Sequence, residues 1–379
     1  MHILVAPNAF KNSLTAPEVA DAVSQGLHNS RLSCTTECFP VGDGGDGTAA
    51  LIINKFNGIT IEVQVRDPLN RMVNATFGLI YNGATAVIEM ADASGIKLLS
   101  ADEINPLKTS SVGTGELILA ALDKGVSKII IGLGGSATVD GGAGMLSALG
   151  VKFLDVEGQL LYPSPEHLLK LDKIDTSELD PRLARCSIIV LCDVDNQLLG
   201  SQGSAAVFGP QKGAKDLDVA LLEGILTKIS GIAAEQNGKP MGSVKHGGAA
   251  GGVAAALYSF CNAELVAGAE YFLKMTNFME SLAKCDLVIT GEGSLDEQTL
   301  NGKAPFAVAL LAKQLHIPVI GIAGRVPLIK SEQLDKHFDV LMPIGHEPAN
   351  LQDAFKDTEA NLIRTGTLIG NLYSLSSGK

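Results

Sequence analysis

The sequence predicts an α/β protein of two domains, and three observations carry this prediction. Its 379 residues are too many for one ordinary core and suit two. Apolar strands alternate with amphipathic helices at both ends of the chain, whereas the segment after residue 58 alternates apolar and polar residues between turns. Glycine numbers 42 and aromatic residues make up only 4%, which favours helices of small residues and many tight strand-to-helix turns.

The first element is an apolar strand at 3–7, which a polar loop connects to a helix. Thr15 and Glu18 are spaced as a capping box, so the helix is expected to begin beside them. Apolar residues at spacing four over 19–27 give this helix one apolar face. A strand near 34–41 completes a β-α-β unit.

The middle of the chain opens with antiparallel strands. Residues 59–91 alternate in hydropathy and contain turn sequences at 67–70 and 82–83. The elements expected after them are a helix near 115–124, strands at 128–132 and 151–155 with a helix at 140–149 between them, a strand at 186–192, and helices over 215–235 and 249–260.

In the last third of the chain, apolar strands again alternate with amphipathic helices, as they do at the start. Strands are expected at 286–290, 318–323 and 338–344, with helices at 303–315, near 331–336 and near 350–365. Two strands at the start and three at the end predict a five-stranded doubly wound parallel sheet of the Rossmann or flavodoxin-like kind. Residues 1–59 and 261–379 would form this discontinuous domain and 60–260 an inserted mixed α/β domain, with the active site in the cleft between them.

Charge and composition exclude several classes of protein. The net charge is −12 and no basic stripe is visible, which argues against a nucleic-acid partner. No run approaches the ~18 apolar residues of a membrane span. The N-terminus lacks the basic start and long apolar stretch of a signal peptide, so a cytoplasmic protein is expected. The six cysteines form no CxxC pair, which argues against zinc and for reduced thiols.

Polar clusters follow three strands of the predicted sheet. Asn8, Lys11 and Ser13 follow the first strand, Asp43 and Asp46 lie in the sequence GDGGDGT after the second, and Glu292 and Asp296 follow the strand at 286–290. Ligands of doubly wound sheets bind beyond the carboxyl ends of the strands. GDGGDGT alone is equally well a plain loop. Three such loops at one edge favour a binding site.

The inserted domain carries further candidates. The sequence GLGGSATVDGGAG at 132–144 offers glycine amides for an anion, hydroxyls from Ser136 and Thr138, and the carboxylate of Asp140. Asp193 and Asp195 would lie on one face of an extended chain and suit a hard cation, although an Asx turn is an equally good interpretation. Lys212 lies in the loop sequence GPQKGA.

One motif supports a different function. Gly132, Gly134 and Ala137 satisfy G-x-G-x-x-A after a strand, and Asp155 follows about 20 residues later, as in NAD(P)-dependent oxidoreductases. Asp140 and the glycines beside it argue against this, because they interrupt the first turns of the helix. The oxidoreductase stays as an alternative. A non-catalytic metabolite sensor is another, which turnover would distinguish.

Taken together, the clusters resemble one family over nearly the whole chain. The residues that carry the resemblance are FKNSLTAPEVA (10–20), GDGGDGT (42–48), RDPLNR (66–71), IEMADASG (88–95), NPLKTSSVGTGELI (105–118), IGLGGSATVDGGAGMLSALGVKFLD (131–155), CDVDNQLLG (192–200), AVFGPQKGA (206–214), GGAAGG (247–252) and DLVITGEGSLDEQTLNGKAP (286–305). The chain resembles the bacterial type 1 glycerate kinases. Asn8 and Ile104 depart from the family's more usual aspartate and arginine.

The resemblance implies ATP and Mg²⁺ as cofactors and transfer of the γ-phosphoryl group to D-glycerate, most simply at C2, giving 2-phosphoglycerate and ADP. The departures keep a kinase for a related small hydroxy acid as an alternative. Chemistry then suggests the roles. Lys11, Asp193 and Asp140 would be catalytic; Asn8, Ser13, Arg71, Gly134, Gly135, Ser136, Lys212, Glu292, Asp296 and Arg325 would bind substrate or phosphate; Asp43, Asp193 and Asp195 would hold the metal. A homodimer is a further expectation.

Overall fold

The chain forms two compact units in the computed structural model, which describes residues 1–237, 239–300, 302–329 and 331–377. Unit 1 comprises Met1–Asp43 with Ala269–Lys379, and unit 2 comprises Gly44–Gly268. The sequence placed these divisions after residues 59 and 260. They differ because helix α2 (Thr48–Lys55) packs on strands β4 and β5 of unit 2, and strand β10 (Glu264–Ala267) pairs with β9 of unit 2.

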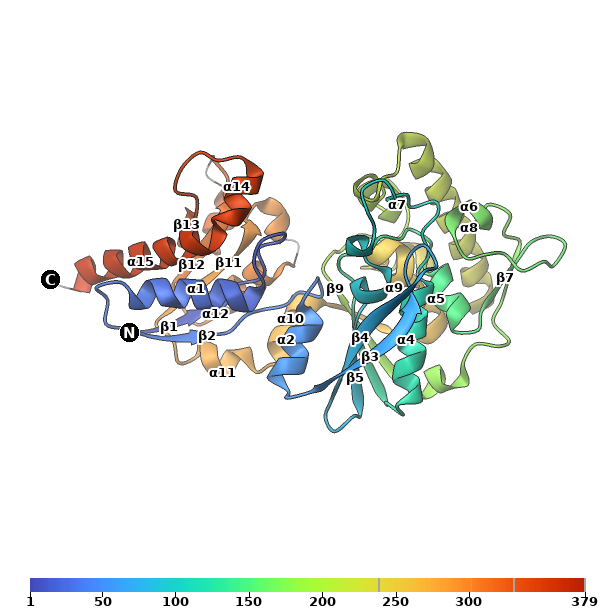
Figure 1. Ribbon diagram of the computed structural model, residues 1–379, viewed down its shortest axis with the longest axis horizontal. Coiled ribbons are helices and arrows are strands. Elements are labelled where there is room, and N and C mark those ends of the chain that lie inside the picture. Colours follow the sequence, from blue (N-terminus) through green and yellow to red (C-terminus); the bar gives the residue numbers. More distant parts are fainter. Residues whose placement is uncertain (238, 301, 330, 378–379) are drawn as a thin grey trace. The chain divides into compact units, whose positions relative to one another are not determined.

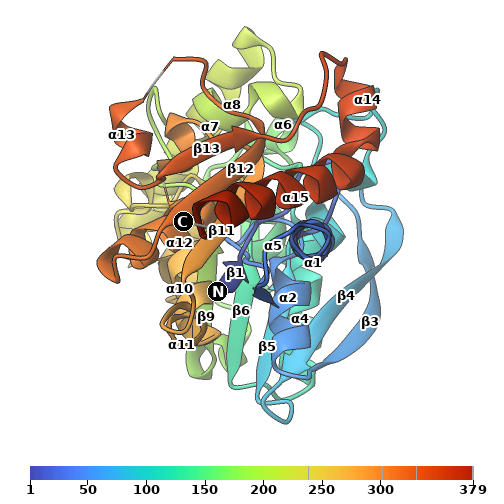
Figure 2. The same ribbon diagram turned by 90° about the vertical axis from the view of Figure 1, so that its left-hand side faces the viewer.

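Unit 1 contains the predicted five-stranded sheet. Its strands are β1 (His2–Val5), β2 (Thr35–Cys38), β11 (Leu287–Ser294), β12 (Val319–Arg325) and β13 (Val340–Pro343). The order is β13-β12-β11-β1-β2 and every pair is parallel. Counted within the unit, this is the flavodoxin order 2-1-3-4-5. Figure 2 shows the central strands side by side. The prediction of a flavodoxin-like doubly wound sheet is therefore confirmed.

The helices of unit 1 are α1 (Ala16–His28), α10 (Gly268–Met275), α11 (Phe278–Leu282), α12 (Ala304–Gln314), α13 (Glu332–Asp335), α14 (Leu351–Lys356) and α15 (Thr358–Ser377). The Glu18 carboxylate accepts from the Thr15 amide at 2.8 Å, as the capping box predicts. Helices α1 and α15 lie side by side (Figure 1), and a Cβ at Gly26 would stand 2.1 Å from the Ile363 carbonyl oxygen. Only glycine permits this approach.

The sheet of unit 2 is mixed. Its strands are β3 (Ile59–Arg66), β4 (Met72–Ile80), β5 (Thr85–Glu89), β6 (Lys128–Gly132), β9 (Ser187–Cys192) and β10, in the order β10-β9-β6-β5-β4-β3. Strand β4 is antiparallel to both of its neighbours, β3 and β5, as predicted. Strands β5, β6, β9 and β10 are parallel to one another. The carboxyl ends of these four parallel strands therefore lie at one edge, where the predicted inserted-domain residues follow β6 and β9.

The helices of unit 2 are α2, α3 (Ala91–Ser94), α4 (Val112–Asp123), α5 (Ala143–Ala148), α6 (Pro165–Leu168), α7 (Ser204–Phe208), α8 (Asp216–Asn237) and α9 (Val253–Cys261). The strand predicted at 151–155 is β7 (Lys152–Leu154), which pairs with β8 (Lys173–Asp175) as a separate two-stranded sheet. The terminal helix expected near 350–365 is the pair α14 and α15. Among the described residues, no helix has the length and apolarity needed to cross a membrane.

Candidate active-site residues

A polar cluster occupies the switch point of the unit 1 sheet, where the order of strands reverses between β1 and β11. Asn8 follows β1, and its amide donates to the Gly291 carbonyl in β11 at 2.8 Å. Its side-chain Nδ2 donates to Asp43 Oδ2 at 2.8 Å. Two of the predicted loops are therefore joined at the place where doubly wound sheets bind ligands.

Glu292 lies beside this cluster at the carboxyl end of β11 and is only 8% exposed. Its Oε1 accepts from the Thr299 hydroxyl at 3.0 Å, and Lys303 Nζ lies 3.4 Å from the same oxygen. Burial raises the pKa of Glu292 to about 7; Lys303 lowers it and the Asp43 charge raises it. The structure thus holds a carboxyl group that can exchange a proton near neutral pH.

The other predicted residues of unit 1 are placed differently. Lys11 and Arg325 are exposed, the latter at the end of β12. The Ser13 hydroxyl donates to the Phe355 carbonyl at 2.8 Å, which ties it to α14. Asp296 accepts from the Ser294 hydroxyl at 3.1 Å and begins the short 3-10 helix Glu297–Leu300. Ser13 and Asp296 therefore make structural contacts, and their binding role stays a prediction.

Two glycine-rich loops lie against each other in unit 2. The Gly134 amide donates to the Gly44 carbonyl at 3.0 Å, and a Cβ at Gly134 would stand 2.3 Å from Gly45 Cα. The Ala137 amide donates to the Ser94 carbonyl at 2.9 Å. Gly135 has φ +69° and lies against the Asp46 carboxylate. The amides of 134 and 137 are therefore used within the protein, and the predicted phosphate cradle is not formed by them.

Lys212 is instead the cation of this region. It ends the 3-10 helix Pro210–Lys212 and is only 4% exposed. Its Nζ donates to Ser136 Oγ and to the Thr138 carbonyl, both at 2.8 Å. Burial lowers the pKa of Lys212 to about 8, while the charges of Asp140 and Asp193 raise it. Lys212 therefore contacts Ser136 and lies close enough to Asp140 and Asp193 to feel their charges.

Asp140 is fully buried at the start of α5. Its oxygens accept from the Ser111 hydroxyl at 2.7 Å and from the amides of Ser111, Gly142 and Gly144 at 2.8–3.1 Å. Burial raises its pKa although these donors lower it. Four donors surround the group and no part of the residue is exposed. This geometry is against the predicted role of Asp140 as the base, and it shows a carboxylate that anchors the loop before α5.

The two acids that follow β9, Asp193 and Asp195, make different contacts. Asp193 is partly exposed and acts on Lys212 electrostatically. Asp195 Oδ1 lies 3.2 Å from both Lys245 Nζ and His246 Nδ1, and its side chain is 53% exposed. Asp195 therefore pairs with the following loop, which supports a turn-stabilising role. The predicted metal and catalytic roles of Asp193 stay predictions.

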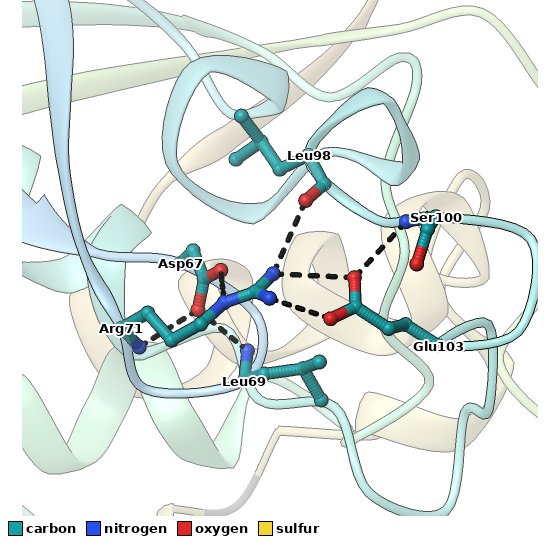
Figure 3. A network of polar contacts seen from close by, with 6 residues as sticks. All are labelled: Asp67, Leu69, Arg71, Leu98, Ser100 and Glu103. Atoms are coloured by element: carbon teal, nitrogen blue, oxygen red, sulfur yellow. Dashed lines mark hydrogen bonds and ion pairs between the residues drawn. The ribbon is translucent and has the colours of Figure 1, made fainter.

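Arg71 was predicted to clamp a substrate carboxylate, and Figure 3 shows its guanidinium already held by two carboxylates. Its Nε donates to Asp67 Oδ2 at 2.6 Å and its Nη1 to Glu103 Oε1 at 2.5 Å. Its Nη2 reaches the Leu98 carbonyl at 3.3 Å. Asp67 is buried and belongs to the turn after β3. Arg71 therefore fastens the loop at 98–103 to that turn.

Comparison with known proteins places the chain. Residues 3–374 match the glycerate kinase family. The chain is 43% identical over 368 residues to glycerate 2-kinase of Escherichia coli K12 and 42% identical over 365 residues to glycerate kinase of Bacillus subtilis 168, with 96% of each chain covered. The chain belongs to the glycerate kinase family. The solved structure of a Salmonella typhimurium LT2 protein assigned as glycerate kinase 2 matches with TM-score 0.82, 41% identity and complete coverage of both chains.

Membership of the glycerate kinase family makes the chain an ATP-dependent phosphotransferase and raises the question of a metal. Within the described part of the chain, no three His, Cys, Asp or Glu side chains lie together as a group that could hold one. Mg²⁺ is commonly bound by one or two carboxylates and otherwise by water and substrate phosphates, so it does not require such a group. The roles of Asp193 in unit 2 and of Asp43 in unit 1 as metal ligands stay predictions.

The structure also bears on the oxidoreductase alternative within this family fold. A dinucleotide fingerprint needs free glycine amides and a helix that starts at once. Here the Gly134 amide is bonded to Gly44, and α5 begins only at Ala143. Gly132 and Gly134 instead permit close packing against the loop at 44–46, and the Ala137 amide is bonded to the Ser94 carbonyl. The glycine pattern therefore has a packing explanation.

Sequence reasoning missed two carboxyl-edge residues of this glycerate kinase family member. Lys303, just before α12, is the cation beside Glu292. Glu89 is the last residue of β5, is 8% exposed and accepts from the Gly47 amide. Burial raises the pKa of Glu89 to about 7, and Asp92 raises it further. Its place at the end of a buried strand was the signal that would have found it.

Proposed function

We propose that this protein transfers the γ-phosphoryl group of ATP to the C2 hydroxyl of D-glycerate, giving 2-phosphoglycerate and ADP. The observation that carries the proposal is full-length similarity to the glycerate kinase family, with the Escherichia coli relative named a glycerate 2-kinase. The buried Lys212 beside Ser136 supports it, because phosphoryl transfer is catalysed mainly by fixed positive charge and positioning.

The roles follow from the contacts of each unit. In unit 2, Lys212 and Ser136 would bind phosphoryl oxygens, and Asp193 would hold Mg²⁺, which neutralises the phosphates when bound. In unit 1, Lys11 would supply an exposed positive charge. Glu292 of unit 1 or Asp193 of unit 2 would accept the proton of the attacking hydroxyl. That both sets act on one substrate is part of the proposal.

The test is an ADP-release assay with Mg·ATP and D-glycerate, L-glycerate, tartronate or no acceptor. We expect turnover with D-glycerate. Turnover with another acid alone would favour the kinase for a related hydroxy acid, for which the departures at Asn8 and Ile104 are the reason. Binding of ATP without turnover would favour a sensor.

The position of the new phosphate needs a second measurement. ³¹P NMR of the product distinguishes the C2 from the C3 ester by the coupling of phosphorus to one or two protons. A two-proton coupling pattern would reject attack by the C2 hydroxyl and leave the kinase assignment intact. The homodimer stays a prediction, which analytical ultracentrifugation tests.

A further inference from the structure

The starting observation is an unpartnered hydroxyl in unit 2. Thr138 is fully buried, and its Oγ1 has no hydrogen-bond partner in the described chain. Leaving a buried polar group unpaired is unfavourable, because it loses its hydrogen bonds to water on folding without gaining others. Two nearby polar groups do have a partner: the carbonyl of Thr138 itself and the hydroxyl of Ser136 both accept from Lys212. The unpaired hydroxyl therefore lies in the loop whose Ser136 hydroxyl and Thr138 carbonyl hold the Lys212 ammonium.

Lys212 itself has unused capacity. An ammonium carries three N–H donors, and two are directed at Ser136 Oγ and the Thr138 carbonyl. The oxygens of Asp140 accept from Ser111, Gly142 and Gly144 instead of from Lys212. The Ser136 hydroxyl, which accepts from Lys212, still has its own proton to donate.

These groups have the chemistry of an oxyanion site. One ammonium donor, the Ser136 proton and the Thr138 proton are three donors from two neighbouring segments. Ser136 is 8% exposed and Lys212 4%, so a ligand can reach their edge. The Thr138 hydroxyl has no exposed surface, so it can meet a ligand only after a local movement of the loop at 134–138.

A purely structural lysine would explain less. It would account for the two bonds that join the segment after α7 to the loop after β6. It would not explain why the loop retains a buried hydroxyl in place of an apolar side chain of the same shape. Valine at 138 would fill the same space without the penalty.

We propose that Lys212, Ser136 and Thr138 form a phosphoryl subsite that is completed only when the anion binds, with the Thr138 hydroxyl as its third donor. The loop at 134–138 closes on the anion and brings the Thr138 hydroxyl to one of its oxygens. The identity of the ligand as a phosphoryl group of ATP rests on the proposed function. Binding of the anion itself does not require turnover.

The experiment measures binding of inorganic phosphate to the full chain by isothermal titration calorimetry, together with thermal unfolding without phosphate. Thr138→Val should weaken the Kd about 10-fold, the loss of one hydrogen bond to a charged ligand, and should not lower the Tm. Lys212→Met should abolish binding. Thr138→Ser, which restores a hydroxyl, should recover the wild-type Kd and exclude a folding defect as the cause.

Thr114→Val is the matched control. Thr114 is equally buried in unit 2, but its hydroxyl is satisfied by Ser94 Oγ at 2.7 Å. It should lower the Tm and leave the Kd unchanged. A Thr138→Val protein that binds phosphate within twofold of wild type would overturn the proposal, as would wild-type protein that does not bind phosphate. Phosphate binding that depends on Thr138 in a protein without glycerate kinase activity would reject the proposed function and keep the subsite.

Discussion

A buried acid of unit 1 and a buried cation of unit 2 can be compared, because the acid lies near the carboxyl end of β11 and the cation contacts the loop that follows β6. Unit 1 holds Glu292, whose pKa burial raises to about 7, and unit 2 holds Lys212, whose pKa burial lowers to about 8. Both shifts arise because a charged group is removed from water. A fold that only needed stability would bury apolar side chains at these places.

The effects of burying Glu292 and Lys212 on the stability of the fold depend on pH in opposite directions. From its ordinary value of 4.5 to about 7, folded Glu292 keeps a proton that the unfolded chain has lost, so stability falls as the pH rises through this window. From about 8 to 10.5, the unfolded chain binds a proton that folded Lys212 has lost, so stability rises with pH there. Between pH 7 and 8 both groups destabilise the fold. In the same range the pKa of Glu292 suits proton exchange, and Lys212 still carries the charge that anion binding requires.

The largest effect is expected for Lys212, where a substitution should lower activity without lowering stability. Lys212→Met should lower kcat/KM by about 10²–10³-fold, the usual loss when one fixed positive donor to a transferring group is removed. It should not lower the free energy of unfolding at pH 7, because the desolvated charge is gone. Lys239→Met is the control, since Lys239 is bonded to Asn262 and the Tyr258 carbonyl. Equal kinetic losses in both variants would make Lys212 structural.

Glu292→Gln tests the other half of the comparison. Because glutamine does not ionise, the variant should be more stable than wild type by about 3 kcal/mol at pH 8, and the difference should vanish near pH 4.5. Denaturant unfolding across this range measures it. Thr299→Val removes a hydrogen bond that lowers the pKa of Glu292 and keeps the carboxyl group, so its stability should still fall as the pH rises. A Glu292→Gln difference that is constant with pH would contradict the shifted titration.

Lys11→Ala tests whether the exposed Lys11 of unit 1 contributes to catalysis as the buried Lys212 of unit 2 is expected to do. We expect kcat to fall about 10²-fold with the Tm within a degree or two, because the side chain is exposed and packs little. The loss should shrink in high salt, since solvent screens exposed charges more than buried ones. A kcat within twofold of wild type in a folded protein would remove Lys11 from the catalytic residues.

Arg71→Met gives the smallest effect. It leaves the buried Asp67 carboxylate with the amides of Leu69 and residue 71, so unfolding should become easier by about 1–2 kcal/mol. The KM for glycerate should stay within threefold, because the guanidinium is occupied by Asp67 and Glu103. A tenfold higher KM at unchanged stability would restore its predicted role as a substrate clamp.

How much the sequence predicts differs between fold and site. The parallel sheet of unit 1 was predictable because short apolar strands alternate with helices whose caps, such as Thr15 with Glu18, are local. The candidate residues at strand ends were predictable because topology brings strand ends together. The pairing of Lys212 with Ser136 was not, since 76 positions separate them and no local pattern encodes the contact. Burial of Asp140 was equally hidden, because four donors that hold it come from two segments.

The insertion of unit 2 has a consequence for the order of events on the ribosome. Strand β1 pairs with β11, so Ile3 waits for Leu287 as its neighbour, whereas every strand of unit 2 lies within residues 59–267. Unit 2 can therefore fold while the chain is still being synthesised. The N-terminal strand leaves the exit tunnel first and completes its sheet among the last, and until then its apolar edge is a natural client for chaperones that hold nascent chains.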